Sequence, residues 1–296
     1  MSADEIATDD PTLPLRTAEG GFAMLALDQR ESLRQMFAPA DGREVGDDEL
    51  RTFKRAAMSV LTPFASAVLL DRLYGVDENR PVEVDESCAL ILAADVLHHG
   101  ETGGVDRTTL DPEVTAEYVR SVGASALKLL VIWRRDGQEA ERAALVRSFL
   151  DVAAEAGVVS LVEGIVRPAE GDWKDPGERH TAILDAAREL SSYGGTIYKA
   201  EVPGYVQGDL SRVREQAERM TELVDGPWVV LSNGVAQLDF AEAVGQACAG
   251  GASGFLAGRA IWADTVSETD HLLALTRRSV DRLNGLREIV ASTLRG

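Results

Sequence analysis

Short apolar runs alternate with amphipathic segments along most of the chain. Eight of these runs are stretches rich in Val, Ile, Leu and Ala, the composition expected of parallel β-strands that are buried on both faces. Between most of them, apolar residues recur at three- and four-residue intervals, which predicts helices. The expected strands lie within residues 22–27, 66–71, 88–95, 126–133, 158–168, 197–202, 227–235 and 253–262.

The predicted helices follow the strands with few interruptions. An Asp-Pro pair is expected to open the helix at residues 111–123. Residues 98–107 and 171–180 are predicted to be loops, because their Gly and charged residues leave no apolar periodicity, and a Pro-containing linker is expected between the second and third strands. The helices are predicted within residues 31–37, 47–64, 111–123, 139–157, 180–194, 209–226, 239–251 and 270–295.

Strands that alternate with helices favour a closed (β/α)₈ barrel over an open doubly wound sheet. A chain of 296 residues with 45% hydrophobic residues can bury one full-sized core. We therefore predict an α/β protein with a single-domain TIM barrel at residues 20–296. Residues 1–19 are expected to form a polar arm or short capping helix, and extra helices are expected at both ends of the chain.

The formal net charge of −19 disfavours binding to nucleic acid or to an anionic membrane surface. A small anionic substrate can still bind where a few arginines converge. Cys88 and Cys248 lie among small or apolar residues, which indicates buried free thiols. With no secretory signal and no apolar stretch long enough to span a bilayer, a cytoplasmic protein is expected.

The C-terminal segment 270–295 carries several leucines at helical spacing. They are suited either to packing against the barrel or to a contact between subunits, and we expect a homo-oligomer. These leucines are Leu272, Leu273, Leu275, Leu283 and Leu286.

In a (β/α)₈ barrel the chemistry takes place where strands end and the following loops begin. Polar side chains in or just after the predicted strands are therefore the candidates for an active site. They are Asp28, Gln29, Arg30, Asp71, Asp95, Lys128, Glu163, Lys199, Ser232 and Arg259.

Lys199 interrupts the apolar sixth strand, within the sequence GGTIYKAEVPG. A buried ammonium group needs a carboxylate partner or a lowered pKa, and a neutral amine is a nucleophile that condenses with carbonyl groups. This chemistry predicts a Schiff base on Lys199. The alternative is a structural ion pair with the nearby Glu201.

Cleavage of a carbon–carbon bond next to an imine also needs a base. Glu163 on the fifth strand is a neighbour of Lys199 if the strand order is sequential. Lys128 on the fourth strand would add a positive charge that favours the neutral form of Lys199. Lys128 and Glu163 alone are equally compatible with a buried ion pair in a packed barrel.

The turns after the last two strands predict a phosphate site. Loops at this position in TIM barrels often bind phosphate through backbone amides and a short helix, and an arginine supplies a fork of donors. The alternative is that these glycines only permit tight turns. The candidate residues are Ser232, Gly234, Gly258 and Arg259.

A catalytic metal is not expected. His98 and His99 are adjacent, His180 and His271 lie in or beside predicted helices, and none has the spaced carboxylate partners of a zinc site. The chain also lacks a nucleophile elbow, a P-loop sequence and a dinucleotide-binding fingerprint. No cofactor is therefore predicted.

Six strand-end sequences together resemble those of the class I aldolases related to tagatose-1,6-bisphosphate aldolase. They are GGFAMLALDQRESLRQMF, ALKLLVIWR, VEGIVRP, YKAEVPG, LSNGV and ASGFLAGRAIW, which span nearly the whole chain. Within that family the chain resembles the sulfofructosephosphate aldolase branch. The resemblance implies a (β/α)₈ fold and metal-free cleavage of a ketose 1-phosphate to dihydroxyacetone phosphate and a three-carbon aldehyde, which is sulfolactaldehyde in that branch.

The resemblance also implies roles for single residues. It assigns the imine to Lys199 and the proton-shuttling carboxylate to Glu163. Lys128 matches the second active-site lysine of the family. The Asp-Gln pair of the family matches Asp28 and Gln29, and Arg30 is the candidate ligand for the distal anionic group. The phosphate ligands implied by the resemblance are Ser232, Gly234 and Arg259.

Two positions depart from the family pattern. Gly164 replaces a usual proline, which is expected to loosen the strand end near Glu163. Asn233 replaces a small residue and is expected to change the phosphate pocket in detail. Three alternatives to a sulfofructose 1-phosphate aldolase remain: an aldolase for tagatose 1,6-bisphosphate or a related ketose phosphate, a sugar-phosphate isomerase or epimerase that forms no imine, and a non-catalytic sugar-phosphate sensor.

Overall fold

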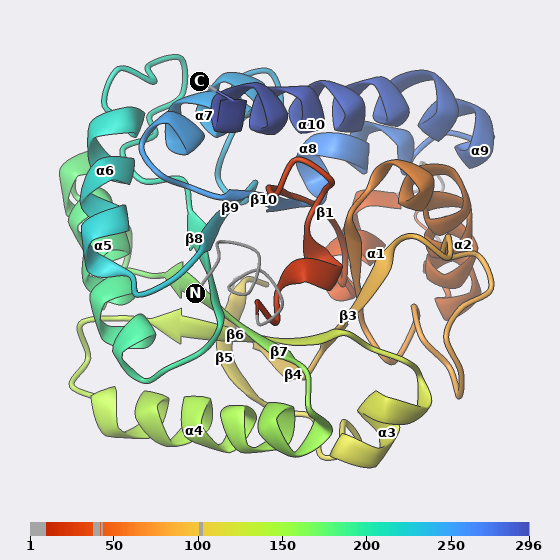
Figure 1. Ribbon diagram of the computed structural model, residues 1–296, viewed down its shortest axis with the longest axis horizontal. Helices are drawn as coiled ribbons and strands as arrows, with labels where there is room; N and C mark the ends of the chain where they lie inside the picture. The colour runs from red at the N-terminus through yellow and green to blue at the C-terminus, as the bar shows by residue number, and fades with distance from the viewer. Residues whose placement is uncertain (1–9, 38–41, 43, 101–102, 296) are drawn as a thin grey trace, which may run out of the picture.

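The computed structural model describes residues 10–37, 42, 44–100 and 103–295. Eight parallel strands close into a barrel with helices around it, which confirms the predicted TIM barrel (Figure 1). The strands follow one another around the barrel in sequence order, because each connection returns the chain to the neighbouring position. They are β1 (Phe22–Leu27), β2 (Ala67–Leu70), β3 (Ala89–Ala93), β6 (Ala126–Trp133), β7 (Val159–Val166), β8 (Ile197–Glu201), β9 (Trp228–Leu231) and β10 (Gly254–Ala257).

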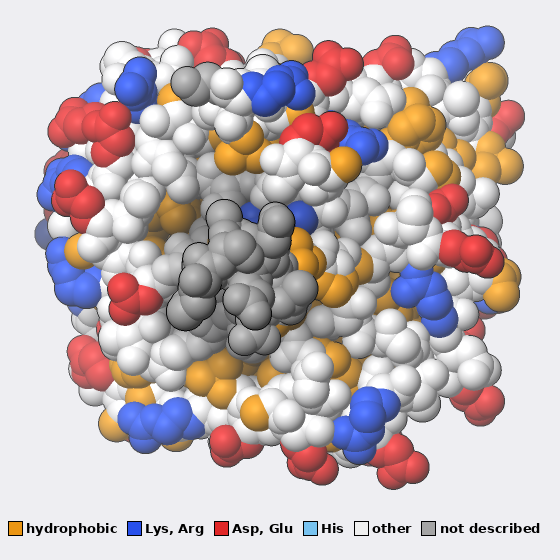
Figure 2. All heavy atoms as spheres, in the orientation of Figure 1, with side chains coloured by type: hydrophobic (Ala, Val, Ile, Leu, Met, Phe, Trp, Pro, Cys, Tyr) orange, Lys and Arg blue, Asp and Glu red, His pale blue; other side chains and the backbone are white. Residues whose placement is uncertain are grey.

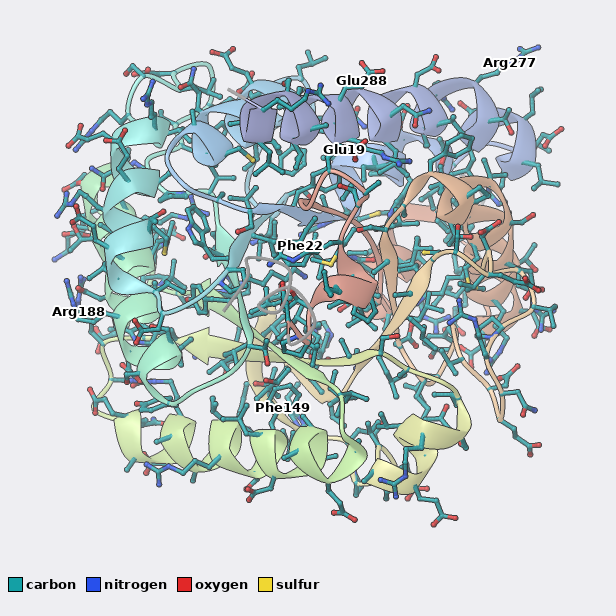
Figure 3. The ribbon with its side chains drawn as sticks, viewed as in Figure 1. Glu19, Phe22, Phe149, Arg188, Arg277 and Glu288 are labelled. Carbon is teal, nitrogen blue, oxygen red and sulfur yellow. The ribbon has the colours of Figure 1, made fainter. Side chains whose placement is uncertain are left out.

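The helices cover the outside of the barrel with their apolar faces inward. In Figure 3, Phe149 points from α4 toward the strands, whereas Arg188 on α5 points away from them. The helices of the described chain are α1 (Glu31–Phe37), α2 (Asp47–Leu61), α3 (Ala116–Ser121), α4 (Glu139–Ala156), α5 (Pro176–Ser192), α6 (Val213–Leu223), α7 (Phe240–Ala249), α8 (Arg259–Trp262), α9 (His271–Ala274) and α10 (Val280–Arg295).

Apolar side chains fill the barrel below the polar strand ends. Met24, Leu161 and Leu256 belong to one fully buried cluster inside the barrel. Leu15 joins the same cluster from the short 3₁₀-helix Leu13–Leu15, so the described part of the N-terminal arm packs against the interior of the barrel. Residues 1–9 of that arm lie outside the described residues.

The segment predicted as a polar loop at residues 98–107 is a correction. Residues 98–99 and 105–107 lie in two antiparallel strands, β4 (Asp95–His99) and β5 (Val105–Leu110), which the barrel does not include. Val105 packs against Ile132, Ile165 and Leu231 above the barrel interior. Paired polar side chains on the hairpin obscured its strand pattern in the sequence.

Two helix boundaries also differ from the prediction. The Asp-Pro pair does not open the helix at α3, because Asp111 bonds the backbone of Glu113 in a turn and Thr115 caps the helix instead. Conversely, α5 begins at Pro176, inside the segment predicted as a loop, with Asp175 as its N-cap. In both places the residue that accepts a hydrogen bond from the third following amide sets the start.

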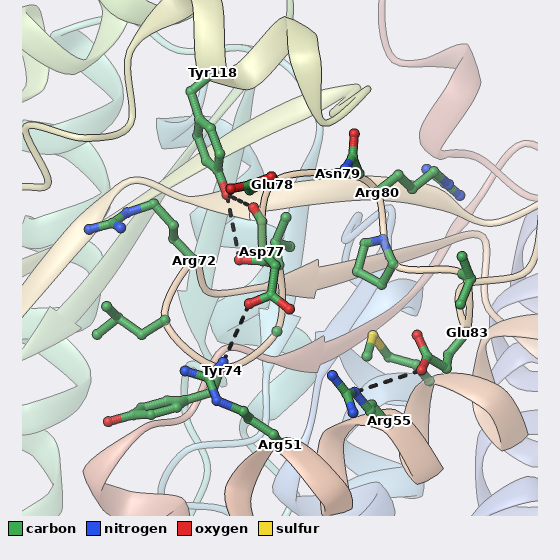
Figure 4. Close-up of a pocket in the computed structure, with 16 residues that line it drawn as sticks. Arg51, Arg55, Arg72, Tyr74, Asp77, Glu78, Asn79, Arg80, Glu83 and Tyr118 are labelled. Atoms are coloured by element: carbon green, nitrogen blue, oxygen red, sulfur yellow. Dashed lines mark hydrogen bonds and ion pairs between the residues drawn. The ribbon is translucent and has the colours of Figure 1, made fainter. Parts of the chain in front are cut away.

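No helix connects β2 and β3 in the described chain, as the Pro-containing linker predicted. A surface hollow of about 850 Å³ lies in this region, and Figure 4 shows Arg51 and Arg55 from α2, Arg72 from the linker and Tyr118 from α3 around it. None of the predicted site residues lines this hollow. This hollow is therefore separate from the candidate chemistry.

The C-terminal segment forms α9, a π-helical turn at Leu275–Ser279 and α10, which lie against α2, α7 and β1. Leu275, Leu283 and Leu286 are buried in this packing, whereas Leu272 and Leu273 remain exposed. Arg277 points outward from the π-helical turn (Figure 3). Barrel packing thus accounts for three of the five leucines, and the homo-oligomer stays a prediction.

Positive and negative side chains are interspersed on the face shown in Figure 2. Within the described residues, no helix is both long and apolar enough to cross a membrane.

Candidate active site

Lys128 lies at the centre of a buried cluster of carboxylates at the carboxyl ends of the strands. Its Nζ is 2.6 Å from Asp28 Oδ2, 2.8 Å from Asp95 Oδ2 and 3.4 Å from Glu163 Oε2. The side chain has no exposed surface. Register brings Asp95 and Glu163 to Lys128, because β6 pairs with both β3 and β7, whereas Asp28 reaches it from the end of β1.

Lys199 and Glu163 face each other across two adjacent strands. They are register partners on β8 and β7, and Lys199 Nζ is 2.9 Å from Glu163 Oε2. Lys199 is 3% and Glu163 6% exposed. The sequence alternative, in which Lys199 pairs with Glu201, is wrong, because Glu201 bonds to other groups.

The cluster fixes the charges of two predicted residues. Burial alone would lower the pKa of Lys128, but Asp28, Asp95 and Glu163 together raise it above its ordinary value. Burial alone would raise the pKa of Asp28, but Lys128 and Lys199 lower it well below its ordinary range. Lys128 is therefore a permanent cation and Asp28 a permanent carboxylate near neutral pH.

Arg30 does not stand free for a ligand. Its guanidinium donates to the Asp95 carbonyl at 2.6 Å and to Asp95 Oδ1 at 3.1 Å, and it lies 4.0 Å from Asp71 Oδ1. Burial alone would lower the pKa of Arg30, and the two aspartates raise it. Only its buried Nε has no partner. Asp95 thus joins Arg30 to Lys128.

Lys54 is a fully buried lysine that the strand-end search missed. From α2 it forms an ion pair with Asp71 and donates to the Leu27 carbonyl at 2.6 Å. Burial lowers its pKa despite Asp71. A signal was present in the sequence, since Lys54 follows Leu50 and Phe53 on the apolar face of its helix.

These groups form what we call the acidic side of the barrel mouth. It comprises the three carboxylates Asp28, Asp71 and Asp95 and the three cations Arg30, Lys54 and Lys128. Each carboxylate lies within 4.0 Å of at least one of the cations.

Gln29 and Gly258 lie at the junction of β1 and β10. A Cβ at Gly258 would lie 2.4 Å from the Ala26 carbonyl and 3.1 Å from Gln29 Nε2, so only glycine allows this approach. Among the described residues, buried Gln29 Oε1 has no hydrogen-bond partner, which leaves an acceptor available next to Asp28 in the chain. Gly258 therefore has a packing role, whereas Gln29 keeps the capacity to bind a ligand.

Glu201 organises the opposite side of the mouth. Its Oε2 accepts from the Val166 amide at 2.8 Å, and its Oε1 accepts from Arg179 at 2.8 Å and from Asn233 Nδ2 at 3.2 Å. Asn233 Oδ1 in turn accepts from Arg259 at 2.5 Å. The departure noted at Asn233 thus connects Glu201 to the predicted phosphate ligand.

Arg167 and Arg259 have no carboxylate within 4.0 Å in the described part of the chain; Arg167 donates to the Val166 carbonyl, and Arg259 to Asn233. Burial lowers the pKa of both guanidinium groups, and each also feels the more distant carboxylates. We call Arg167, Arg179 and Arg259, with Glu201, the basic side of the mouth. The sequence search found only Arg259 among them.

The predicted phosphate turn lies on this basic side. Ser232 is buried at the end of β9, and Gly234 has a φ of +76°, a left-handed conformation that favours glycine. A Cβ at Gly234 would lie 2.9 Å from an Arg179 nitrogen. The turn is therefore flanked by Arg179 at Gly234 and by Arg259 at Asn233.

The expected loosening at Gly164 is wrong. β7 continues through Gly164 to Val166, and Gly164 is paired with Val131 on one side and Ala200 on the other. A Cβ at Gly164 would collide with the Tyr198 hydroxyl, which occupies the space a larger residue would need. Glu163 consequently stays in register with Lys199.

Among the residues that the structure describes, no three His, Cys, Asp or Glu side chains are placed to share a metal ion. Lys128 Nζ occupies the space between the carboxylates of Asp28, Asp95 and Glu163. His180 is buried away from any partner for its ring nitrogens. Cys88 and Cys248 are both buried free thiols, and burial raises the pKa of each to about 12.

Comparison with known proteins gives relatives along most of the chain. "Tagatose 1,6-diphosphate aldolase" of Listeria monocytogenes is 30% identical over 282 residues, which cover 85% of this chain and 80% of the relative. "Tagatose 1,6-diphosphate aldolase 2" of Streptococcus pyogenes is 28% identical over 280 residues, covering 84% and 83%.

Solved structures share the fold. An archaeal fructose 1,6-bisphosphate aldolase superposes with a TM-score of 0.65 at 18% identity and covers 95% of this chain and 98% of its own. The sequence pattern of the DeoC/LacD family aldolases matches residues 22–264. The chain therefore belongs to the DeoC/LacD family of aldolases, which are lyases.

Proposed function

We propose that the protein is a class I aldolase that reversibly cleaves 6-deoxy-6-sulfofructose 1-phosphate to dihydroxyacetone phosphate and 3-sulfolactaldehyde. The observation that carries the proposal is the pairing of Lys199 with Glu163, 2.9 Å apart at the mouth of the barrel, beside the cationic Lys128. An amine, a proton carrier and a fixed charge in one buried site are the parts that imine chemistry needs. The proposal requires no metal and no cofactor.

In the proposed reaction, the neutral amine of Lys199 attacks the ketone carbon C2 of the substrate. Glu163 delivers the proton with which the hydroxyl of the carbinolamine leaves as water. The resulting iminium accepts the electron pair when the C3–C4 bond breaks. The proton of the C4 hydroxyl passes to the carboxylate of Glu163. Protonation of the enamine at C3 and hydrolysis then release dihydroxyacetone phosphate and regenerate Lys199.

Lys128 and Asp28 serve this sequence without taking part in covalent bonds. Lys128 places a fixed positive charge 3.4 Å from Glu163 Oε2, beside the proposed imine. It also binds one oxygen of Asp28, which leaves the other oxygen available to a substrate hydroxyl. Gln29 Oε1 provides a second acceptor for the hydroxyl groups of the sugar.

Charge balance supports the orientation of the substrate. The basic side carries three guanidinium groups against one carboxylate, which suits the C1 phosphate, with Ser232, Gly234 and Arg259 as its ligands. The acidic side has three cations against three carboxylates. A balanced region favours a distal group of lower charge, and a sulfonate carries one negative charge where a phosphate monoester carries about 1.5 to 2. Arg30 is the candidate for that contact; its Nε lies 4.0 Å from Asp71 Oδ1 and makes no hydrogen bond within the described residues.

A second candidate is cleavage of tagatose 1,6-bisphosphate, because relatives at 30% and 28% identity carry that name. A non-catalytic sensor is a weaker alternative, since Lys199, Glu163 and Lys128 are all present and in contact.

The deciding experiment compares kcat/KM for sulfofructose 1-phosphate, tagatose 1,6-bisphosphate and fructose 1,6-bisphosphate. We expect sulfofructose 1-phosphate to lead by about a hundredfold, equivalent to about 2.7 kcal/mol in the transition state. A lead of similar size for tagatose 1,6-bisphosphate would assign the second function. Absence of cleavage of all three, in a protein that binds them, would favour the sensor.

A further inference from the structure

Asn233 lies between an anion and a cation, a position that requires one group to donate a hydrogen bond and another to accept one. A carboxylate can only accept hydrogen bonds and a guanidinium can only donate them. Asn233 therefore has one possible orientation, with Nδ2 toward Glu201 and Oδ1 toward Arg259, as observed. Because Glu201 holds the Nδ2 end of the amide, the Oδ1 end is fixed in place as an acceptor for Arg259.

Glu201 is itself immobilised. It lies two residues after Lys199 on β8, is 1% exposed, and is held by the Val166 amide on β7 and by Arg179 on α5. The anchor of Asn233 thus rests on two neighbouring elements of the barrel. The strand that carries the proposed imine also sets the position of the phosphate ligand.

We propose that Asn233, oriented by Glu201, is a positioning residue that holds Arg259 for the phosphate of the substrate without cancelling its charge. The inference rests on the proposed function and deepens it. A carboxylate at this position would also hold Arg259, but it would neutralise the guanidinium and face Glu201 with a like charge. A small side chain would leave Arg259 without this acceptor.

Two ligands distinguish positioning for phosphate from a general structural role. Dihydroxyacetone phosphate and dihydroxyacetone present the same ketone to Lys199, and only the first carries the group that Arg259 is expected to bind. Borohydride reduction of the imine at a series of concentrations gives a half-saturating concentration for each ligand. The two numbers separate phosphate binding from imine formation.

We expect Asn233→Asp to raise the half-saturating concentration of dihydroxyacetone phosphate at least tenfold and to change that of dihydroxyacetone less than twofold. Asn233→Ala should shift the phosphate ligand in the same direction by about threefold to tenfold, because Arg259 keeps its charge and loses its acceptor. Asn79→Asp is the matched control. This substitution introduces the same charge in the surface hollow beside the linker between β2 and β3, which Asn79 lines. It should change neither value.

The possible outcomes are distinguishable. Equal shifts for both ligands in the Asn233 variants, or no shift for either, would overturn the positioning role while leaving the aldolase proposal intact. If the wild-type protein is trapped by neither ligand, the proposed function fails and the inference fails with it. If Asn233→Asp does not fold, as judged by its thermal transition, Asn233→Ala decides by the same criterion.

Discussion

On the acidic side of the barrel mouth every carboxylate lies within 4.0 Å of a cation, whereas on the basic side Arg167 and Arg259 face no carboxylate in the described chain. Both sides are built at strand ends from similar residue types. On the first, the protein satisfies its own charges, so removal of one group leaves another buried and unpaired. On the second, three guanidinium groups stand against one carboxylate, and we expect an anionic ligand to neutralise the excess positive charge.

The comparison therefore divides the residues by what their loss should cost. Acidic-side residues should mainly affect folding stability, and basic-side residues should mainly affect the binding of anions. Lys199 and Glu163 lie between the two sides and should affect the chemical step.

The largest effect is expected at Lys199. Lys199→Met should lower kcat/KM by about 10⁴-fold or more, because Lys128, the other described amine near Glu163, is held as a cation by Asp28, Asp95 and Glu163 and cannot replace it. Lys174 is the exposed member of the four lysines, and Lys174→Met is the matched control. A steady-state assay that finds substantial activity in Lys199→Met would remove this residue from the chemistry.

Lys128→Met should destabilise the fold by about 3–5 kcal/mol at pH 7, because Asp28, Asp95 and Glu163 lose their shared partner. The penalty should shrink as the pH falls. In the wild type the lowered pKa of Asp28 contributes stability that is fully present above the pKa of this residue in the unfolded chain. That contribution is lost as the pH falls below the unfolded-state pKa.

The effect of acidification on stability through Asp28 has the opposite sign in Lys128→Met. Without Lys128, burial is opposed only by the weaker effects of Lys199 and Arg30, so we expect the pKa of Asp28 to rise and protonation at lower pH to relieve its charge. Chemical denaturation of both proteins between pH 7.5 and about pH 4.5 measures the difference. A gap that stays constant or widens on acidification would show that Lys128 does not compensate these carboxylates.

A pair of arginine variants contrasts the two sides directly. Arg30→Met should cost about 2 kcal/mol of stability, because Asp95 and Asp71 lose a partner. Arg259→Met should leave stability nearly unchanged and raise KM for a ketose 1-phosphate by about 10- to 100-fold, the range for a hydrogen bond to a charged group. Denaturation and steady-state kinetics on both variants test this. The division between the sides fails if the two variants exchange their effects.

Ionic strength should produce the smallest difference. Added salt screens charges that face solvent more than buried pairs. Between about 0.05 and 0.5 M NaCl we expect KM for the phosphate-bearing substrate to rise a few-fold, with little change in stability from the acidic side. Parallel measurement of KM and of the unfolding midpoint checks this, and a KM that is independent of salt would argue against free charge on the basic side.

The sequence predicted the barrel because its evidence is local. Continuous apolar runs identify buried parallel strands, and all eight predicted strands are present. The hairpin at β4 and β5 was missed because His98 and Arg107 pair outside the core, where apolar alternation does not apply. The start of α3 was misplaced because the Asp-Pro signal cannot tell a turn from a helix cap.

Part of the site was equally predictable. Strand ends converge at one face of a barrel, so Asp28, Lys128, Glu163 and Lys199 were expected to lie together, and their contacts bring them together. What strand-end reasoning cannot supply is pairing. Strand position alone allows Glu201 as a partner for Lys199, because both lie at the same end of the barrel. In the structure Glu201 accepts hydrogen bonds from Asn233 and Arg179 instead.

Helix-borne contributors were beyond that reasoning. Lys54 and Arg179 reach the strand ends from α2 and α5, and their targets depend on helix packing instead of strand position. Asn233 was noticed as a departure from a family pattern, but its meaning depends on the two charges on either side of it.

The most direct test of the central claim is the position of the reduced imine. Incubation with dihydroxyacetone phosphate and borohydride, followed by digestion and mass spectrometry, should place a single adduct on Lys199, with none on Lys54, Lys128 or Lys174. An adduct confined to another lysine, or no adduct at saturating ligand in protein that cleaves substrate, would contradict the account.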